Sequence, residues 1–261
     1  MKKTKKVLAI LLSVLLLTAS FAACGQRAVN DDEDQSTPKA TSTSTPEPTP
    51  EATPEATPEA TPEATPEASN EVDADKAIGV IDGNLYTNEL FKFTAEFPAD
   101  WNIADRDQLL EINRLGADYI KESSGNSAAI DMAMAQIIPL FFVSQHPLDY
   151  TSGTNANINA LAQNLGVSKS LIKGPKNYLE LVPQSMEAQG LDYKMGEITE
   201  LKIGGRDFGK VDGVLTVQGM EITQSMYVTM VDDYVMTFSL TYFSDDEKKQ
   251  LEDIVNTFSF K

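Results

Sequence analysis

The fold is decided by the stretch Met220-Glu-Ile-Thr-Gln-Ser-Met-Tyr-Val-Thr-Met-Val-Asp-Asp-Tyr-Val-Met-Thr-Phe-Ser-Leu-Thr-Tyr242. Apolar runs on both sides of Asp232-Asp233 predict two strands, Met220–Met230 and Tyr234–Tyr242, joined by a tight turn. In the second strand every other residue, from Tyr234 to Tyr242, is large and apolar. This alternation predicts that one face of the strand points into a core, while the residues between face solvent or a second layer.

The sequence on either side extends this hairpin. Two further strands, Tyr193–Leu201 and Asp207–Val217, are separated by Gly204-Gly205, and Gly219 begins the next turn. Such short connections predict a four-stranded antiparallel meander. After it, Ser244-Asp-Asp-Glu247 has the spacing of a helix capping box, because a hydroxyl and a carboxylate three residues apart can satisfy free backbone amides. The helix that follows carries a buried stripe at helical spacing: Leu251, Ile254, Val255 and Phe258.

Upstream of the meander the pattern is mixed. Phe91, Phe93 and Phe97 share one parity and predict a strand, and a helical period follows Trp101 through Leu109, Ile112, Gly116, Tyr119 and Ile120. In the middle we predict strands over Ala128–Met134 and Gln136–Gln145, with Pro139 favouring an edge or a bulge. Helices are predicted over Asn157–Leu165 and Pro175–Gln189. The predicted fold class is α+β, a mainly antiparallel sheet sandwiched by helices.

The first residues have the pattern of a targeting signal. Four lysines precede the apolar run Val7–Leu17, and small residues follow it. The run is shorter than the roughly 20 residues of a membrane span. Phe21-Ala22-Ala23-Cys24 resembles the lipobox of bacterial lipoproteins, and that resemblance implies cleavage before Cys24 and a diacylglyceryl group on its thiol. We therefore predict a lipoprotein signal peptide over residues 1–23 and a lipid anchor at Cys24. The alternative is a simple secretory signal with an incidental cysteine.

The residues after Cys24 have the composition of a spacer. The unit Thr-Pro-Glu-Ala occurs five times between Thr49 and Ala68, and eight of the 13 prolines lie between Pro38 and Pro66. A four-residue period matches neither helix nor strand, and each proline removes a backbone donor. We predict that residues 24–75 are a disordered spacer that holds residues 76–261, a single α+β globular domain, away from the membrane.

Composition excludes several classes of function. The chain has one His, one Cys and a net charge of −18. One His and one Cys cannot make a His or Cys metal centre, and we predict no cofactor or metal site. The acidic balance argues against binding to nucleic acid, which needs a basic surface. Acidic clusters at Asp31–Asp34 and at Asp73 and Asp75 lack the spacing of a calcium loop and are predicted to be solvated charge.

None of the reactive or ligand-binding residues is placed in a catalytic motif. His146 has no Gly-x-Ser-x-Gly partner and is predicted to bond locally at a strand end. Asp232-Asp233 is predicted to be a turn rather than the carboxylate pair of a glycosidase. Gly204-Gly205-Arg206 lacks the strand and helix that flank a dinucleotide-binding loop. Trp101 is predicted to be a core anchor rather than a ligand platform. The strand methionines are predicted to fill the core rather than bind copper: Met220, Met226, Met230 and Met236.

Two segments carry a family resemblance. They are Tyr86-x-Asn88-x-x-Phe91-x-Phe93-x-x-x-Phe97-Pro98-x-x-Trp101 and the ending Asn256-Thr-Phe-Ser-Phe260. Together they resemble the Mog1/PsbP-like fold, and more narrowly the lipid-anchored surface proteins of Firmicutes that carry such a domain behind a Thr/Pro/Glu spacer. Members of this fold are mostly non-enzymatic adaptors. The matching residues are scaffold positions, so the resemblance implies a fold and no functional residue.

Three functions are consistent with these features. The favoured one is a non-enzymatic binding or adaptor module, anchored to the extracytoplasmic face of the cell membrane through the lipid on Cys24, with a protein or cell-envelope partner. The second is a hydrolase of cell-wall or glycan material, which requires two carboxyl groups in a cleft and a raised pKa on one of them. The third is a solute-binding lipoprotein, which requires two lobes around a ligand.

Overall fold

The computed structural model describes residues 74–217 and 219–261. The predicted signal peptide, Cys24, the acidic cluster Asp31–Asp34, Asp73 and the repeats of the spacer lie outside the described residues. Within the described part, no helix has both the length and the apolar character needed to cross a bilayer.

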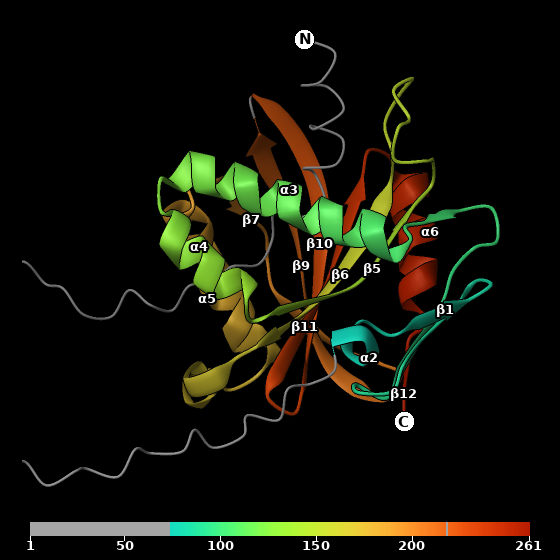
Figure 1. The fold of residues 1–261 in the computed structure, drawn as a ribbon, viewed down its shortest axis with the longest axis horizontal. Helices are drawn as coiled ribbons and strands as arrows, with labels where there is room; N and C mark the ends of the chain where they lie inside the picture. Colours follow the sequence, from blue (N-terminus) through green and yellow to red (C-terminus); the bar gives the residue numbers. More distant parts are fainter. Residues whose placement is uncertain (1–73, 218) are drawn as a thin grey trace, which may run out of the picture. The chain divides into compact units, whose positions relative to one another are not determined.

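The main sheet of the described residues has eight strands, and the pairings are antiparallel. Its hydrogen-bonded order begins at a short strand near the start of the domain and ends in the predicted meander (Figure 1). The strands in spatial order are β4 (Asn102–Ile103), β5 (Ile137–Ser144), β6 (Asn157–Asn164), β11 (Tyr234–Tyr242), β10 (Met220–Val231), β9 (Arg206–Val217) and β7 (Asp192–Met195), and β8 (Thr199–Ile203) also pairs with β9.

A second, four-stranded sheet is built from the two ends of the domain. Its order is β1 (Val80–Asp82), β2 (Leu85–Asn88), β3 (Phe93–Glu96) and β12 (Ser259–Phe260). Phe93 packs its ring against four others, with centroid distances of 5.9 Å to Tyr86, 5.4 Å to Phe238, 5.1 Å to Phe258 and 4.9 Å to Phe260. The two segments that carry the family resemblance therefore meet in one aromatic core.

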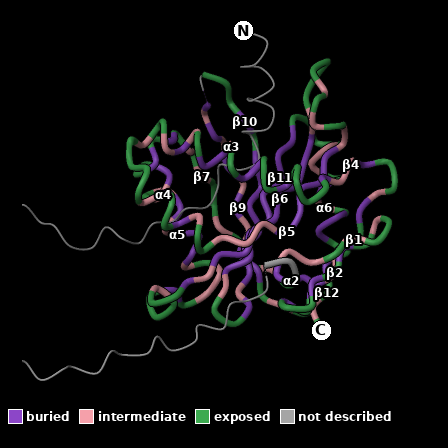
Figure 2. The backbone as a smooth tube through the Cα atoms, viewed as in Figure 1, coloured by how far each residue is buried: buried purple, intermediate pink, exposed green. Residues whose placement is uncertain are grey.

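Helices complete the layers. On one face of the main sheet lie α3 (Arg106–Ser124), α4 (Ser127–Met134) and α5 (Pro175–Ala188). The strands at the centre of the domain are mostly buried (Figure 2). On the other face lie the small sheet and α6 (Asp245–Val255). The remaining helices are short: α2 (Ala74–Ile78) and η1 (Gly166–Leu171). This arrangement confirms the predicted α+β class.

Helix starts follow the expected capping chemistry. Asp105 caps α3: its Oδ1 accepts from the amide of Gln108 at 2.9 Å, and the Gln108 side chain accepts from the Asp105 amide. Ser244 caps α6 through the amide of Glu247, as predicted. The Glu247 carboxylate reaches one residue further back than a capping box requires and accepts from the Phe243 amide at 2.7 Å.

Two elements of the middle were predicted wrongly. Residues 128–134, predicted as a strand, lie in the helix α4, whose cap is the Asn126 side chain. Residues 157–165 were predicted as a helix, but residues 157–164 form the strand β6 between β5 and β11. The prediction for Pro139 is confirmed, because the register of β5 shifts between Pro139 and Phe141. The predicted strand Tyr193–Leu201 is split into β7 and β8.

Candidate functional site

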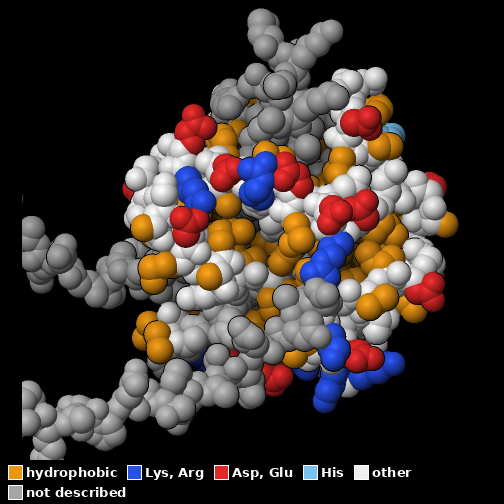
Figure 3. All heavy atoms as spheres, in the orientation of Figure 1, with side chains coloured by type: hydrophobic (Ala, Val, Ile, Leu, Met, Phe, Trp, Pro, Cys, Tyr) orange, Lys and Arg blue, Asp and Glu red, His pale blue; other side chains and the backbone are white. Residues whose placement is uncertain are grey.

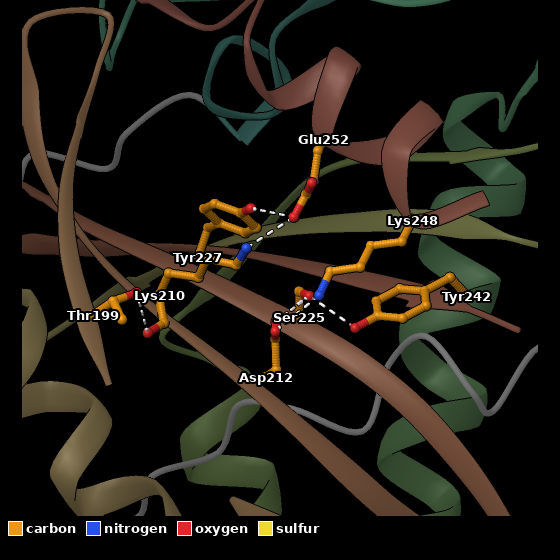
Figure 4. Close-up of polar contacts among 8 residues, drawn as sticks. All are labelled: Thr199, Lys210, Asp212, Ser225, Tyr227, Tyr242, Lys248 and Glu252. Carbon is orange, nitrogen blue, oxygen red and sulfur yellow. Dashed lines mark hydrogen bonds and ion pairs between the residues drawn. The ribbon is translucent and has the colours of Figure 1, made fainter. Parts of the chain in front are cut away.

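A cluster of charged and hydroxyl side chains lies between α6 and the main sheet (Figure 4). Strand alternation places Lys210 and Asp212 of β9 on the same face as the core residue Phe208. Ser225 and Tyr227 face the same way on β10, and Tyr242 does so on β11. Helix α6 supplies Lys248 and Glu252, which are four residues apart and so share one side of the helix. We call these seven residues the α6 cluster.

One half of the α6 cluster is centred on Glu252. Lys210 Nζ donates to Glu252 Oε1 at 2.8 Å, and the Tyr227 hydroxyl donates to the same oxygen at 3.3 Å. The Lys210 ammonium also lies 5.1 Å from the centroid of the Tyr227 ring, within range of a cation–π contact. The carboxylate of Glu252 thus holds both β9 and β10 against the helix.

The other half is centred on Asp212. Lys248 Nζ donates to Asp212 Oδ2 at 2.8 Å, and the Ser225 hydroxyl donates to Asp212 Oδ1. Ser225 Oγ also lies 3.2 Å from the Tyr242 hydroxyl. Both carboxylates of the cluster are therefore paired with a lysine and a hydroxyl, and their negative charge is locally balanced.

The pKa shifts agree with stable ion pairs. Burial by itself would raise the pKa of Asp212, but the bonds from Lys248 and Ser225 outweigh burial and hold that pKa below its ordinary value. Burial would lower the pKa of Lys210 and of Lys248, but the bonds to Glu252 and Asp212 hold both above the ordinary value for lysine. At neutral pH all three groups carry their full charge.

This arrangement limits the chemistry of the cluster. A serine nucleophile needs a base that can take its proton, and Lys248 with a raised pKa stays protonated. Asp212 with a lowered pKa is a weak base. The hydrolase hypothesis needs a carboxylic acid with a raised pKa, and the α6 cluster shows the opposite shift at Asp212. The geometry fits a structural role, in which the cluster fixes α6 to the sheet.

The role of Asp212 gives a pH-dependent prediction. A carboxylate whose pKa is lowered in the folded state contributes stability above its unfolded pKa of about 3.9, and that contribution is lost as the pH falls through the folded value. We expect Asp212→Asn to lower the melting temperature by a few degrees at pH 7 and by much less at pH 3. Thermal unfolding of both proteins at the two pH values measures this. An equal loss at pH 7 and pH 3 would show that the charge of Asp212 does not stabilise the fold.

A groove lies outside the α6 cluster, between α3, α4 and β5. Its cavity volume is about 310 Å³. Its apolar lining includes Leu110 and Ala117 of α3 and Ile137 of β5, and Figure 3 shows apolar side chains gathered beneath a row of charges on this face. The charges of the rim are paired, Arg114 with Asp118 at 2.6 Å and Lys121 with Asp131 at 2.5 Å. We call this the α3 groove.

The other residues considered from the sequence have structural roles. The His146 ring stacks on Tyr150 at 4.1 Å, and the backbone of His146 bonds to the Asn155 side chain. Asp232 has a positive φ of 53° in the β10–β11 turn, and Asp233 pairs with Lys169.

The remaining candidates lie in turns, in the core or at the surface. Gly204 and Gly205 both have positive φ in the β8–β9 turn. Trp101 is buried in the core, as are Met226 and Met236, whereas Met220 is exposed. Asp75 lies in α2. No group of three His, Cys, Asp or Glu side chains that could hold a metal ion is found among the described residues.

Sequence reasoning missed both the α6 cluster and the α3 groove. The alternation of β9 contained a signal for the first, because Lys210 and Asp212 share the parity of the core residue Phe208. Charged side chains at inward positions of a strand must find partners, so they mark a buried polar contact. The groove had no such signal, because it depends on how α3, α4 and β5 meet.

Comparisons with known proteins give similarities among solved structures alone. No protein-family model matches the chain, and no curated protein matches it either. Among solved structures, it is similar to the cyanobacterial PsbP protein (CyanoP) of Synechocystis sp. PCC 6803, with 15% identity and a TM-score of 0.44 over 70% of this chain and 96% of that one. It is also similar to LpqN of Mycobacterium tuberculosis, described as involved in cell envelope biogenesis, with 14% identity and a TM-score of 0.34 over 64% of this chain and 82% of that one.

Proposed function

We propose that this chain is a lipoprotein anchored at the extracytoplasmic face of a cell membrane, where its domain acts as a non-enzymatic binding or adaptor module. The observation that carries the proposal is the order of segments in the sequence. A lysine-led apolar run ends at Cys24, and a proline-rich spacer separates that cysteine from the folded domain. A diacylglyceryl group on Cys24 would hold the chain on the bilayer, because two acyl chains bind stably where one does not.

The start of the domain suits attachment to a tether. The Ala77 carbonyl accepts from Asn88 Nδ2 at 2.8 Å, and the Ile78 carbonyl accepts from the Tyr86 hydroxyl at 2.7 Å. These bonds tie the end of α2 to β2 of the small sheet. The domain therefore has a fixed point at the end of the spacer, where two buried side chains of β2 hold the backbone of α2.

The α3 groove is the surface that suits a partner. Its exposed lining is mainly apolar and its rim charges are already paired, so a partner gains mainly by burying apolar surface. The alternatives have less support. The carboxylates of the α6 cluster are held by lysines, and the described residues form one compact unit rather than the two lobes of a transporter-feeding solute binder.

If the α3 groove binds a partner, a charge placed in its lining should reduce cross-linking to that partner. We expect Leu110→Asp, which puts an unpaired charge on the lining of the α3 groove, to reduce cross-linking of the chain to a membrane or envelope partner at least tenfold. Leu110 is 43% exposed, so the domain should tolerate the change. Cross-linking in intact cells, followed by separation of the cross-linked species, measures the effect.

A matched variant controls for the added charge. Leu171→Asp makes the same change at another exposed leucine, on η1 and outside the groove. It should leave cross-linking unchanged. Equal losses in the two variants, or no cross-linked species with the wild-type chain, would contradict a binding role for the groove.

A further inference from the structure

The segment that joins β6 to α5 exposes apolar side chains to solvent. Its 3₁₀ helix η1 carries Val167, which is 96% exposed, and Leu171, which is 63% exposed. Val167 is the most exposed large hydrophobic residue of the described part of the chain. In Figure 1 η1 belongs to the olive ribbon at the lower left edge of the domain. We call residues 165–176 the η1 segment.

The backbone of the η1 segment is held to the domain at its two ends. Leu165 and Ile172 are buried in the hydrophobic cluster under α3 and α5. The Leu165 amide donates to the Asp233 carbonyl at 2.9 Å, and the Gly166 amide donates to Asn164 Oδ1 at 2.8 Å. Because the segment has its own buried anchors, the fold does not need the exposed apolar residues between them.

The charges of the η1 segment are all positive. Its lysines are exposed, and they are Lys169, Lys173 and Lys176. The sequence has no acidic residue between Asp149 and Glu180, although the whole chain has 39. Lys169 pairs with Asp233, whereas Lys173 and Lys176 form no ion pair among the described residues. Two ammonium groups therefore stand beside the exposed apolar side chains, on a domain that is acidic elsewhere.

This combination fits the surface of an anionic bilayer. Apolar side chains enter the boundary between head groups and acyl chains, while lysines beside them attract the phosphates of anionic lipids. A soluble polyanion would bind the lysines but leave Val167 and Leu171 in water. A protein interface of ordinary size buries about 800 Å² on each partner, more than two protruding side chains supply. A bilayer accepts single side chains, so it is the partner that both features favour.

We propose that the η1 segment is a second membrane contact, through which the domain rests on an anionic bilayer with Val167 and Leu171 inserted between the head groups. The inference rests on the proposed function, because a lipid anchor keeps the domain within reach of the bilayer and a weak contact then suffices. The contact is separate from the α3 groove. A tethered domain keeps its groove near the membrane without it, so Leu171→Asp remains a control for binding in the groove.

The test is fluorescence of a single label on the full chain, mixed with vesicles that contain no other protein. Cys24 is the only cysteine, so once it carries lipid, Ser170→Cys provides the only free thiol for an environment-sensitive dye. The vesicles are phosphatidylcholine alone, or phosphatidylcholine and phosphatidylglycerol in equal parts. We expect the dye to enter the apolar phase in the second kind and to stay in water in the first. Fluorescence lifetimes give the ratio of inserted to exposed dye.

Charge variants measure the contribution of the lysines. Lys173→Gln combined with Lys176→Gln should lower the ratio of inserted to exposed dye about twentyfold with the anionic vesicles, or roughly fivefold for each lysine. The matched control is Lys194→Gln combined with Lys249→Gln, which removes the same charge from exposed positions on β7 and α6. That pair should leave the ratio unchanged.

A second label position controls for general adsorption, and flotation separates the two proposals. Ser152 is exposed in the loop before β6, at the opposite end of that strand from η1, so a dye on Ser152→Cys should stay in water. Flotation with the vesicles reports the anchor, while the dye reports η1. A chain that does not float but whose dye at position 170 still enters anionic vesicles would contradict the anchor alone. A dye at position 170 that stays in water with both vesicles, an equal response at position 152, or no effect of the lysine changes would overturn the membrane contact.

Discussion

Replacing Cys24 with serine is expected to abolish incorporation of labelled palmitate into the chain and to leave residues 1–23 attached. A serine hydroxyl is a much weaker nucleophile than a thiol and does not replace it as the lipid acceptor. Because lipidation precedes cleavage in the lipoproteins that this segment resembles, the unlipidated chain should keep its signal and migrate as a longer species. Metabolic labelling and gel electrophoresis of whole cells give both readouts.

The neighbouring Phe21 provides the control. Leucine is the more usual residue of a lipobox at this position, so Phe21→Leu should label and process at least as well as the wild type. If Cys24→Ser is processed to the same length as the wild type, the segment is a simple secretory signal and the cysteine is incidental. The anchor proposal would then be wrong, while the description of the fold would be unaffected.

A second substitution with a large expected effect lies in the aromatic core. Phe238 of β11 is fully buried, and its ring lies 4.6 Å from Phe258 and 5.4 Å from Phe93 by centroid distance. It thus joins the main sheet to the small sheet and to the end of the chain. We expect Phe238→Ala to lower the free energy of unfolding by about 3–5 kcal/mol, because it removes buried apolar surface and leaves a cavity. In a domain of this size that corresponds to a fall of roughly 10 °C in melting temperature.

An exposed phenylalanine nearby is the control for that variant. Phe243 follows β11 directly and is 41% exposed, so Phe243→Ala should change the free energy of unfolding by less than about 1 kcal/mol. Urea unfolding of both variants at pH 7 makes the comparison. Equal effects in the two would mean that the packing of the two sheets around Phe238 does not stabilise the domain.

The C-terminal third could be predicted from the sequence because its signals are local. The alternation from Tyr234 to Tyr242 is confirmed: Met236, Phe238 and Leu240 lie in the core with the small sheet. Val235 packs instead under the second layer on the opposite face. Short turns joined these strands in order along the chain, so no long-range pairing had to be inferred.

The middle of the chain could not be predicted for a physical reason. β6 reads Asn-Ile-Asn-Ala-Leu-Ala-Gln-Asn, and both of its faces are buried, so the alternation that marks a half-exposed strand is absent. Its alanines, leucine and glutamine favour a helix by intrinsic propensity, and pairing with β5 and β11 overrides that preference. In α4, by contrast, an apolar run suggested a strand, although Asn126 ahead of it is a capping residue.

The same error hid which polar residues lie together on the face of the main sheet toward α3 and α5. Asn157 and Asn159 share a face only when the segment is a strand, so a helical prediction could not place them with Ser239 and Thr241. The α6 cluster was hidden differently, since Lys248 and Glu252 look like ordinary surface residues of an acidic helix. Only the packing of α6 on β9 and β10 gives them their partners.

Mass spectrometry of the N-terminal peptide of the protein purified from membranes tests the lipoprotein proposal most directly. We predict a peptide that begins at Cys24 and whose mass exceeds that of the bare sequence by a diacylglyceryl group. An N-terminal peptide with an unmodified Cys24, or one that begins at another residue, would contradict the proposal that this domain works from a lipid anchor.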